Sequence, residues 1–274
     1  MKIIFIKLEA MRNTLNDFLK KIVRQIKVIH PLINEFKYEL QFFFRQVFKI
    51  SHEDHLYFLK KIKLSKPEQE YIFIDIGANR GQTIQSVRML KKFKIISFEP
   101  ISFLYKKIIK KYKCDYLNTF CFGLSNKESI EYIHTPFYNK VPFYGLSSLS
   151  REESLNFFKE DRFLFFNSRL LKVKRLQIKI KTLDSFNLDC DFLKADVQGN
   201  ELNTIKGAIE TIKKSQPFII LERPSKDLEV EFLKQFGYKP YIFEKGIFYR
   251  GFNSYNVIFM KEKHKKMFNK NLFQ

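Results

Sequence analysis

Residues 72–83 read IFIDIGANRGQT, and this stretch decides the fold. A run of apolar residues leads into Asp75, and Gly77, Asn79 and Gly81 follow before a helical pattern begins. Gly77 permits a tight turn and a close approach of a ligand to the main chain, and Asn79 is one of the few residues other than glycine that tolerate a positive φ. The stretch therefore predicts a strand, a turn and a helix, and the turn can hold a nucleotide-like ligand.

A carboxylate follows at the position where such a ligand would carry its ribose. Glu99, in ISFEP at 96–100, ends the next predicted strand 22 positions after Gly77. In dinucleotide folds an acidic residue about 20 positions after the glycine-rich turn accepts hydrogen bonds from the ribose hydroxyls. The two features together predict an adenosine-bearing cofactor, although the spacing is not G-x-G-x-x-G. The alternative is that Glu99 only caps the helix that follows Pro100.

A third group of polar residues lies in DFLKADVQGNELNTIKGA at 191–208. Alternation along the predicted strand places Lys194 and Asp196 on one face, with Asp196 at the carboxyl end, where open α/β sheets hold their ligands. We therefore expect Asp196 to contact the reacting group of a substrate. Glu201 fits either a plain helix start or a chemical role, and Glu222 is a weaker candidate at the carboxyl end of a further strand.

Around these motifs apolar strands alternate with helical stretches, which predicts a doubly wound α/β sheet that is mostly parallel. Residues 238–243 and 255–260 are two further apolar runs without a helix between them, so we expect an antiparallel hairpin at the end of the sheet. The strands predicted before this hairpin are 71–76, 94–99, 116–121, 191–196 and 217–222, and the helices are 82–92, 102–112, 201–214 and 226–236.

The chain divides into an N-terminal helical extension at 1–66, a main domain at 67–263 and a basic tail at 264–274. In the extension apolar residues recur every three or four positions, which is the period of one helix face, and Pro31 interrupts the pattern. We favour helices packed on the main domain; the alternative is a basic amphipathic helix on an anionic membrane. A Phe-rich insert at about 135–170 follows the third strand and is expected to carry substrate contacts.

The succession FIDIGANRGQT, SFEP, TLDSF, DFLKADVQGNELNTIKGA, PFIILE and FGY resembles the FkbM-type methyltransferases, which depend on S-adenosylmethionine and have the class I methyltransferase fold. The resemblance covers about residues 70–260. It implies a Rossmann-like, seven-stranded sheet whose last strand is antiparallel, in agreement with the expected hairpin. It does not explain the N-terminal extension or the Phe-rich insert.

The resemblance also implies roles for individual residues. The cofactor S-adenosyl-L-methionine would place its methionine end at the first turn and its ribose at Glu99, and the segment from Asp196 to Glu201 would line the transfer site. The family more usually has Glu at the position of Gln198, which puts a role of this position as base or metal ligand in doubt. We assign no metal ligands. The predicted cofactor-binding residues are Asp75, Gly77, Asn79, Gly81 and Glu99, and the catalytic candidates are Asp196, Glu201 and Glu222.

The leading functional hypothesis is an S-adenosylmethionine-dependent O-methyltransferase that methylates a hydroxyl of a sugar, glycan or other small metabolite. The acceptor class comes from the resemblance, and Asp196 is expected to be the base or orienting group. One alternative is a catalytically silent module that docks on an anionic membrane or glycan surface. The intact first turn, Glu99 and Asp196 argue against it. The other alternative is an RNA methyltransferase.

Charge and composition narrow these hypotheses. The 274 residues include 50 Lys and Arg against 29 Asp and Glu, which gives a formal charge of +21, yet residues 183–260 carry −1. Because the excess is spread thinly over the rest, we expect no dedicated nucleic-acid binding. No apolar run approaches the roughly 20 residues of a membrane span, and no signal peptide is recognised, so we expect a cytoplasmic protein. Peripheral membrane contact through residues 1–66 stays an open alternative, and the oligomeric state is not predicted.

Overall fold

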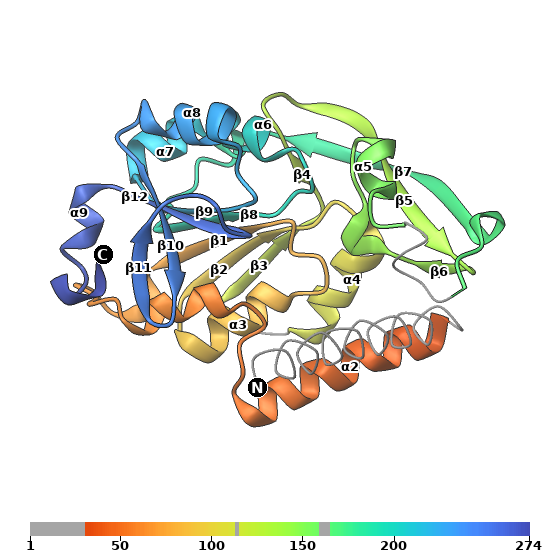
Figure 1. The fold of residues 1–274 in the computed structure, drawn as a ribbon, viewed down its shortest axis with the longest axis horizontal. Coiled ribbons are helices and arrows are strands. Elements are labelled where there is room, and N and C mark those ends of the chain that lie inside the picture. Colours follow the sequence, from red (N-terminus) through yellow and green to blue (C-terminus); the bar gives the residue numbers. More distant parts are fainter. Residues whose placement is uncertain (1–30, 113–114, 159–164) are drawn as a thin grey trace, which may run out of the picture. The chain divides into compact units, whose positions relative to one another are not determined.

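The computed structural model describes residues 31–112, 115–158 and 165–274, which fall into two compact units (Figure 1). Of the described residues, the main unit comprises 42–112, 115–132 and 177–274, and the smaller unit comprises 31–41, 133–158 and 165–176. Every site residue predicted from the sequence lies in the main unit. The part of the predicted helical extension at 1–30 lies outside the described residues.

An eight-stranded sheet in the order β11-β10-β12-β9-β8-β1-β2-β3 forms the centre of the main unit (Figure 1). The pairs β1–β2, β2–β3, β1–β8 and β8–β9 are parallel, whereas β12 runs antiparallel to β9 and to β10, and β10 runs antiparallel to β11. The strands are β1 (Ile72–Ile76), β2 (Lys94–Phe98), β3 (Leu117–Phe120), β8 (Phe192–Ala195), β9 (Phe218–Glu222), β10 (Lys239–Glu244), β11 (Ile247–Arg250) and β12 (Asn256–Met260).

The expected α/β architecture is confirmed, but the seven-stranded, mostly parallel sheet is wrong in detail. The terminal antiparallel pair, β10 with β12, is present as expected. The additional strand, β11, lies in the segment that was expected to be only a loop between them. Lys245 and Gly246 both have positive φ, 51° and 84°, which is the backbone of a two-residue hairpin turn, so the chain reverses directly after β10. The result is a mixed sheet of eight strands.

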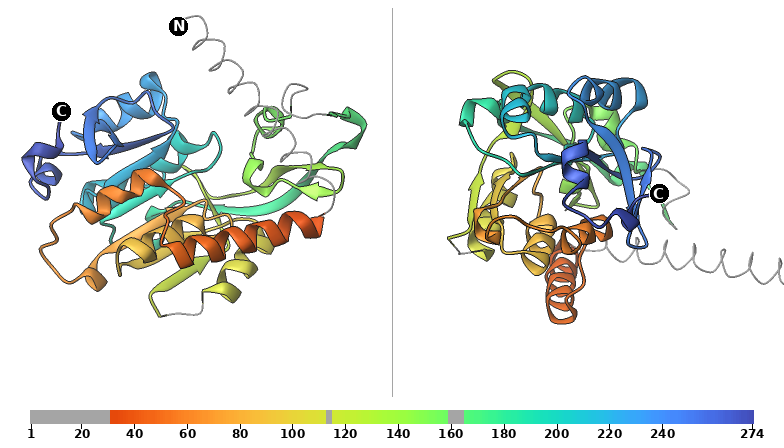
Figure 2. Two further views of the ribbon diagram at one scale, coloured as in Figure 1. Left: turned by 60° about the horizontal axis from the view of Figure 1, so that its bottom comes forward. Right: turned by 90° about the vertical axis from the view of Figure 1, so that its left-hand side faces the viewer.

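Helices cover both faces of this sheet (Figures 1 and 2). The predicted helix 201–214 is divided at Gly207, where the carbonyl oxygen of Ser125 comes so close that a Cβ atom would lie 2.0 Å from it. Asp184, in the TLDSF motif, caps the second part by accepting hydrogen bonds from the backbone of Glu210 and Thr211, at 3.0 and 2.8 Å. One face carries α3 (Gln82–Leu90), α4 (Ser102–Lys111) and a 3-10 helix (Asp54–Lys60), and the other carries α6 (Glu201–Lys206), α7 (Ile209–Ser215), a π-helix (Lys226–Val230) and α8 (Glu231–Lys234).

The segment 264–274, which was predicted to be a basic tail, contains helical structure and buried residues. It contains the second half of α9 (Glu262–Lys265) and a 3-10 helix (Lys270–Leu272). His264 and Phe268 are buried, and Phe268 packs edge-on against Phe218 and Phe248 of the sheet. The aromatic residues of this segment thus supply apolar surface that packs on the sheet, although its high Lys content had suggested a polar segment.

The Phe-rich insert forms a small aromatic core within the smaller unit. Tyr138 stacks on Phe158 and Phe166, with ring centroids 6.1 and 5.6 Å apart, and Phe143 meets Phe158 edge-on. These aromatic rings therefore pack against one another within the insert. A second sheet has the order β4-β7-β5-β6. Its strands are β4 (Gly123–Leu124), β5 (Ser129–Tyr138), β6 (Val141–Pro142) and β7 (Leu171–Lys181), and the insert also contains α5 (Arg151–Leu155) and 3-10 turns at Tyr144–Leu146 and Ser168–Leu170.

The helix α2 (Pro31–Phe48) represents the described part of the N-terminal extension. Its Phe42 is buried, and the backbone oxygen of Phe42 accepts a hydrogen bond of 2.8 Å from Gln85 of α3. Several other large apolar side chains of α2 are exposed, with Phe36 at 69% and Phe48 at 63%. Within the described ranges, no helix combines the length and the apolar character required to cross a membrane.

Replacement of Gly77 by Ala tests the close packing of the first turn. Gly77 has a φ of 86°, and a Cβ atom there would lie 2.0 Å from the backbone oxygen of Asp196. Gly246 has a similar φ of 84°, and a Cβ atom at Gly246 would have no neighbour within 4 Å. Gly246→Ala is therefore a control that measures only the cost of placing alanine at a positive φ, which is about 1–2 kcal/mol. We expect Gly77→Ala to lower the free energy of unfolding by at least about 2 kcal/mol more than this control, because backbone must move. Urea unfolding measures both, and equal losses would contradict the close contact.

Candidate active site

The carboxyl ends of β1, β2, β8 and β9 bring the predicted acidic residues to one edge of the sheet. Asp75 lies in β1 directly beside Lys194 of β8 in the parallel register. Glu99 follows β2, Asp196 follows β8, and Glu222 is the last residue of β9. The prediction that Lys194 and Asp196 share a face is confirmed, because the Lys194 Nζ atom lies 3.5 Å from Asp196 Oδ2.

The first turn has the backbone that its sequence predicts. Gly77, Asn79 and Gly81 all have positive φ, at 86°, 50° and 81°. The backbone N–H groups of Gly77 and Ala78 both donate to the carbonyl oxygen of Phe98 at the end of β2, at 2.9 and 3.0 Å. These bonds fix the turn against the neighbouring strand, above the edge where the acidic residues gather.

Glu99 is buried, and its side chain is hydrogen-bonded to the first turn. One carboxylate oxygen accepts from the backbone N–H of Asn79 at 2.7 Å, and the other accepts from the backbone N–H of Ile101 at 2.8 Å. Burial raises the pKa of Glu99 to about 8 in spite of these two bonds. The bond to Ile101, just before α4, agrees with the capping alternative, whereas the bond to Asn79 ties Glu99 to the first turn. A ribose-binding role stays a prediction.

Two buried side chains near the turn have polar atoms without hydrogen-bond partners among the described residues. Asp75 is fully buried, and neither of its carboxylate oxygens accepts a hydrogen bond. The side-chain oxygen of Asn79 is in the same state. Burial raises the pKa of Asp75 to about 7. Unsatisfied buried acceptors are costly and rare in native proteins, so these atoms indicate a place where a ligand donates hydrogen bonds.

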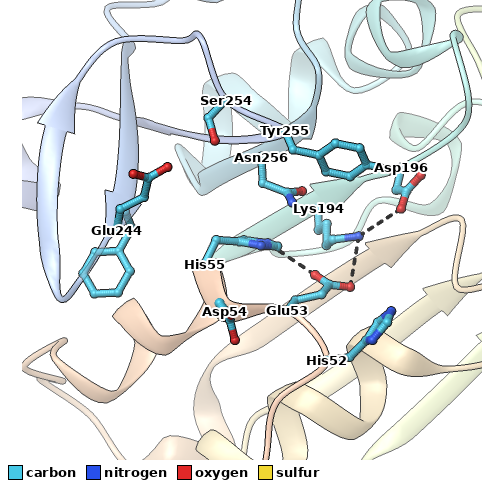
Figure 3. A pocket seen from close by; sticks show the side chains of 11 residues that line it. His52, Glu53, Asp54, His55, Lys194, Asp196, Glu244, Ser254, Tyr255 and Asn256 are labelled. Atoms are coloured by element: carbon cyan, nitrogen blue, oxygen red, sulfur yellow. Dashed lines mark ion pairs between the residues drawn. The ribbon is translucent and has the colours of Figure 1, made fainter. Parts of the chain in front are cut away.

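The Lys194 ammonium group connects Asp196 to Glu53, which comes from the segment before the main sheet (Figure 3). Its Nζ atom lies 3.6 Å from Glu53 Oε1, and the same oxygen accepts a hydrogen bond of 2.7 Å from Thr83 of α3. Burial alone would lower the pKa of Lys194, but the surrounding carboxylates raise it above its ordinary value. Burial likewise opposes ionisation of Glu53, but Lys194 and its other partners hold the pKa of Glu53 below the usual range.

Sequence reasoning did not identify Glu53. It lies in SHED at 51–54, a polar segment inside the predicted helical extension, and no spacing or motif relates it to a residue 141 positions later. The polar run itself, between apolar stretches, is the one signal that could have drawn attention to it.

Asp196 and Glu222 form a pair that one amide group holds together. The Gln198 side-chain nitrogen donates to Asp196 Oδ1 at 2.8 Å and to Glu222 Oε2 at 3.1 Å. Burial, followed by the neighbouring Asp196, raises the pKa of Glu222 to about 8. Burial would also raise the pKa of Asp196, but Lys194 and the hydrogen bonds lower it. At neutral pH the pair therefore holds its proton on Glu222 and its negative charge on Asp196.

Gln198 explains how two carboxyl groups share this position. An amide donates two hydrogens, one toward each carboxyl group, whereas a glutamate here would add a third carboxyl group. A role for position 198 as a base is therefore not supported by its contacts. Across the described residues, no group of three or more His, Cys, Asp and Glu side chains could hold a metal ion.

Glu201 has a different set of contacts from Asp196. Its two carboxylate oxygens accept from the backbone N–H groups of Val197 and Gly199, both at 3.0 Å. These bonds close the turn between β8 and α6 and fit the helix-start interpretation. They leave Glu201 pointing at backbone, so its catalytic role is an untested prediction.

A cavity of about 480 Å³ opens beside Asp196, on the side of the sheet formed by β8, β12 and β10 (Figure 3). It contains none of the five residues predicted to bind the cofactor. Asp196 is half-buried and lies between the first turn and this cavity. The lining consists of His52, Glu53, Asp54, His55, Lys194, Asp196, Phe243, Glu244, Ser254, Tyr255 and Asn256.

Comparison with known proteins identifies a matching family. Residues 75–240 match the family described as the Methyltransferase FkbM domain. No curated protein matches the sequence. Among solved structures, the methyltransferase FkbM from Methylobacillus flagellatus KT is similar at 16% identity and a TM-score of 0.42, over 72% of this chain and 44% of that one. Precorrin-6y C5,15-methyltransferase from Geobacter metallireducens GS-15 is similar at 14% identity and a TM-score of 0.38, over 74% of this chain and 85% of that one. The chain thus spans less than half the length of the first of these.

The protonation of Glu222 predicts a pH-dependent effect of Glu222→Gln on stability. The pKa of Glu222 is about 8 in the native state, whereas a glutamate in an unfolded chain has a pKa of about 4.3. Between pH 5 and 8 the native state therefore binds more protons, and wild-type stability from this group falls as the pH rises. Glutamine does not titrate, so the free energy of unfolding of the variant should rise relative to that of the wild type by roughly 1 kcal/mol for each unit of increasing pH in this range.

Urea unfolding of both proteins at pH 5 and pH 8 measures this difference. Glu231→Gln, a change at an exposed glutamate, gives the background variation. A difference between Glu222→Gln and wild type that is the same at both pH values would mean that Glu222 is ionised throughout, and the assignment of the proton would be wrong.

Proposed function

Because this chain belongs to the FkbM methyltransferase family, we propose that it transfers a methyl group from S-adenosylmethionine to a hydroxyl group of a sugar, glycan or other small metabolite. The observation that carries the proposal is the Asp196 carboxylate, ionised and half-buried between the first turn and a polar cavity. A cofactor at the turn and an acceptor in the cavity would meet at this side chain.

The residues of the first turn fit the cofactor. The unsatisfied oxygens of Asp75 and Asn79 are acceptors that suit the ammonium group of its methionine part. Glu99 lies beside the turn, where its carboxyl group would hold the ribose hydroxyls. The carboxylates of this edge also favour a positively charged ligand. When bound, the cofactor supplies an electrophilic methyl group on a sulfonium ion.

Asp196 acts on the acceptor hydroxyl in this proposal. Its side chain is 32% exposed, so a ligand in the cavity can reach it. Lys194 and Gln198 fix its position, and alignment of reacting groups can lower a barrier by about 7–11 kcal/mol. Because its pKa is lowered, Asp196 is a weak base: it orients the hydroxyl and accepts its proton late, as the oxygen becomes positive. Proton transfer of this kind contributes about 10²–10⁴-fold.

The neighbouring carboxyl groups have supporting tasks. Glu222 is protonated at neutral pH and therefore does not compete for the proton of the acceptor. Glu201 holds the turn that follows Asp196. Both serve the proposed reaction by keeping the ionised Asp196 carboxylate in place.

The lining of the cavity supports a polar acceptor. Phe243 is its one apolar residue, and the others carry carboxylate, imidazole, amide, hydroxyl or ammonium groups. Such a lining can hydrogen-bond a molecule rich in hydroxyl groups, whereas a lipid or polyketide would leave these polar groups unsatisfied.

Asp196→Asn should abolish methyl transfer and leave cofactor affinity unchanged. The amide keeps the shape of the side chain but cannot accept the proton of the hydroxyl. Calorimetry with S-adenosylmethionine measures binding, and release of S-adenosylhomocysteine over a panel of sugar acceptors measures turnover. Loss of cofactor binding would move Asp196 to a cofactor-binding role, and full turnover would exclude it from the transfer step.

Glu99→Ala should weaken cofactor binding by roughly 1–3 kcal/mol, which corresponds to two hydrogen bonds of about 0.5–1.5 kcal/mol each to a largely neutral carboxyl group. Calorimetry with S-adenosylhomocysteine measures the change in affinity. Circular dichroism checks that the variant still folds after loss of the hydrogen bond to Asn79. Glu128→Ala, at an exposed site, is the control. An unchanged affinity would exclude Glu99 from the ribose site.

A further inference from the structure

The cavity beside Asp196 is acidic in a chain that is strongly basic. Its lining includes the four carboxyl groups of Glu53, Asp54, Asp196 and Glu244, and only one ammonium group, that of Lys194. With neutral histidines the lining carries a formal charge of −3, whereas the whole chain carries +21. The charges nearest to a ligand in this cavity are therefore mostly negative.

The one cation of the lining is already engaged. Lys194 is buried and is shared between Glu53 and Asp196, at 3.6 and 3.5 Å. Asp54 and Glu244 are exposed toward solvent and form no ion pair in the part of the chain that the structure describes. Their charges remain available to a ligand.

A second observation is a pair of buried polar atoms in the same wall that contact each other. His55 is only 8% exposed, and its Nε2 atom forms no hydrogen bond among the described residues. Glu53 Oε2 lies 3.3 Å from this nitrogen and likewise accepts no hydrogen bond. Figure 3 shows both side chains in the lining beside Lys194. The two atoms face each other, and Glu53 Oε2 keeps a further lone pair that can accept a hydrogen bond from a ligand.

We propose that the cavity binds the methyl acceptor and that this acceptor carries a protonated amine as well as hydroxyl groups, as an amino sugar does. This inference rests on the proposed methyl transfer. Asp54 and Glu244 attract the ammonium group, and Ser254 and Asn256 on the opposite wall can hydrogen-bond hydroxyls. The volume of about 480 Å³ lies within the usual range for small-molecule sites. An acceptor with a carboxylate or phosphate is repelled by the same charges.

The cofactor is also a cation, but it does not explain this cavity. The residues whose unsatisfied oxygens suit the cofactor, Asp75 and Asn79, are absent from the lining, as is Glu99. Changes at Asp54 and Glu244 therefore affect acceptor binding and leave cofactor binding unchanged.

Binding of three small probes to the full-length protein tests the proposal. Glucosamine, glucose and glucuronate share one ring and differ in charge, and calorimetry in the presence of saturating S-adenosylhomocysteine gives their dissociation constants. We expect glucosamine to bind at least about tenfold more tightly than glucose, and glucuronate to bind most weakly. Equal binding of glucosamine and glucose, tighter binding of glucuronate, or no binding of any probe would overturn the proposal.

A double variant shows whether the preference originates in this cavity. Asp54→Asn with Glu244→Gln should reduce the preference for glucosamine over glucose to less than about twofold and leave the affinity for S-adenosylhomocysteine unchanged. Asp227→Asn with Glu231→Gln makes the same change of charge at exposed positions outside the cavity and should keep the preference. A weaker affinity for S-adenosylhomocysteine in the first double variant would mean that the cavity holds the cofactor, and the proposal would be wrong.

The outcomes separate this inference from the proposed function. If S-adenosylhomocysteine binds and a neutral or anionic acceptor is methylated, the methyltransferase function stands and the cationic acceptor is refuted. If S-adenosylhomocysteine does not bind at all, the proposed function itself fails.

Discussion

A single buried ammonium group, that of Lys194, is the interaction on which the site depends. A charge taken out of water costs several kcal/mol unless partners with good geometry compensate for it. Lys194 has two such partners, Glu53 from the segment before the sheet and Asp196 from the carboxyl end of β8. Thr83 of α3 then holds Glu53 in place. One buried charge thereby ties three separate parts of the main unit to the edge of the sheet where the acidic residues gather.

The same charge makes the carboxyl groups around it unequal. Asp196 lies beside Lys194 and stays ionised, whereas Glu222, which two hydrogen bonds of Gln198 link to Asp196, holds a proton up to a pH of about 8. Two carboxyl groups this close cannot both ionise readily, and the position of the ammonium group decides which of them does. The difference between a proton acceptor and a neutral neighbour therefore follows from packing and not from residue type.

Local patterns in the sequence were sufficient to predict the strand, turn and helix that carry this site, but not the partner that Glu53 supplies to Lys194. Apolar runs and positive-φ residues predict β1, its turn and α3, and simple alternation places Lys194 with Asp196. Glu53 could not be predicted, because its contact with Lys194 joins positions 141 residues apart that share no periodic signal. The need for glycine at position 207 has the same origin, since the backbone of Ser125, which is distant in sequence, leaves no room for a Cβ atom there. Sequence patterns predict the local structure of a segment. They do not predict which distant segment packs against it.

Fold and ligand selectivity depend on different charges in this cavity. Lys194 is paired with both Glu53 and Asp196, and removal of Lys194 would leave two carboxylates without the buried charge that compensates them. Asp54 and Glu244 are exposed, and exposed charges contribute little to stability. The paired charges therefore maintain the structure and the ionisation of Asp196, whereas the unpaired charges at the mouth set the potential that an incoming molecule meets. Because the two sets do not overlap, the charge preferred in an acceptor can change without a change in the fold.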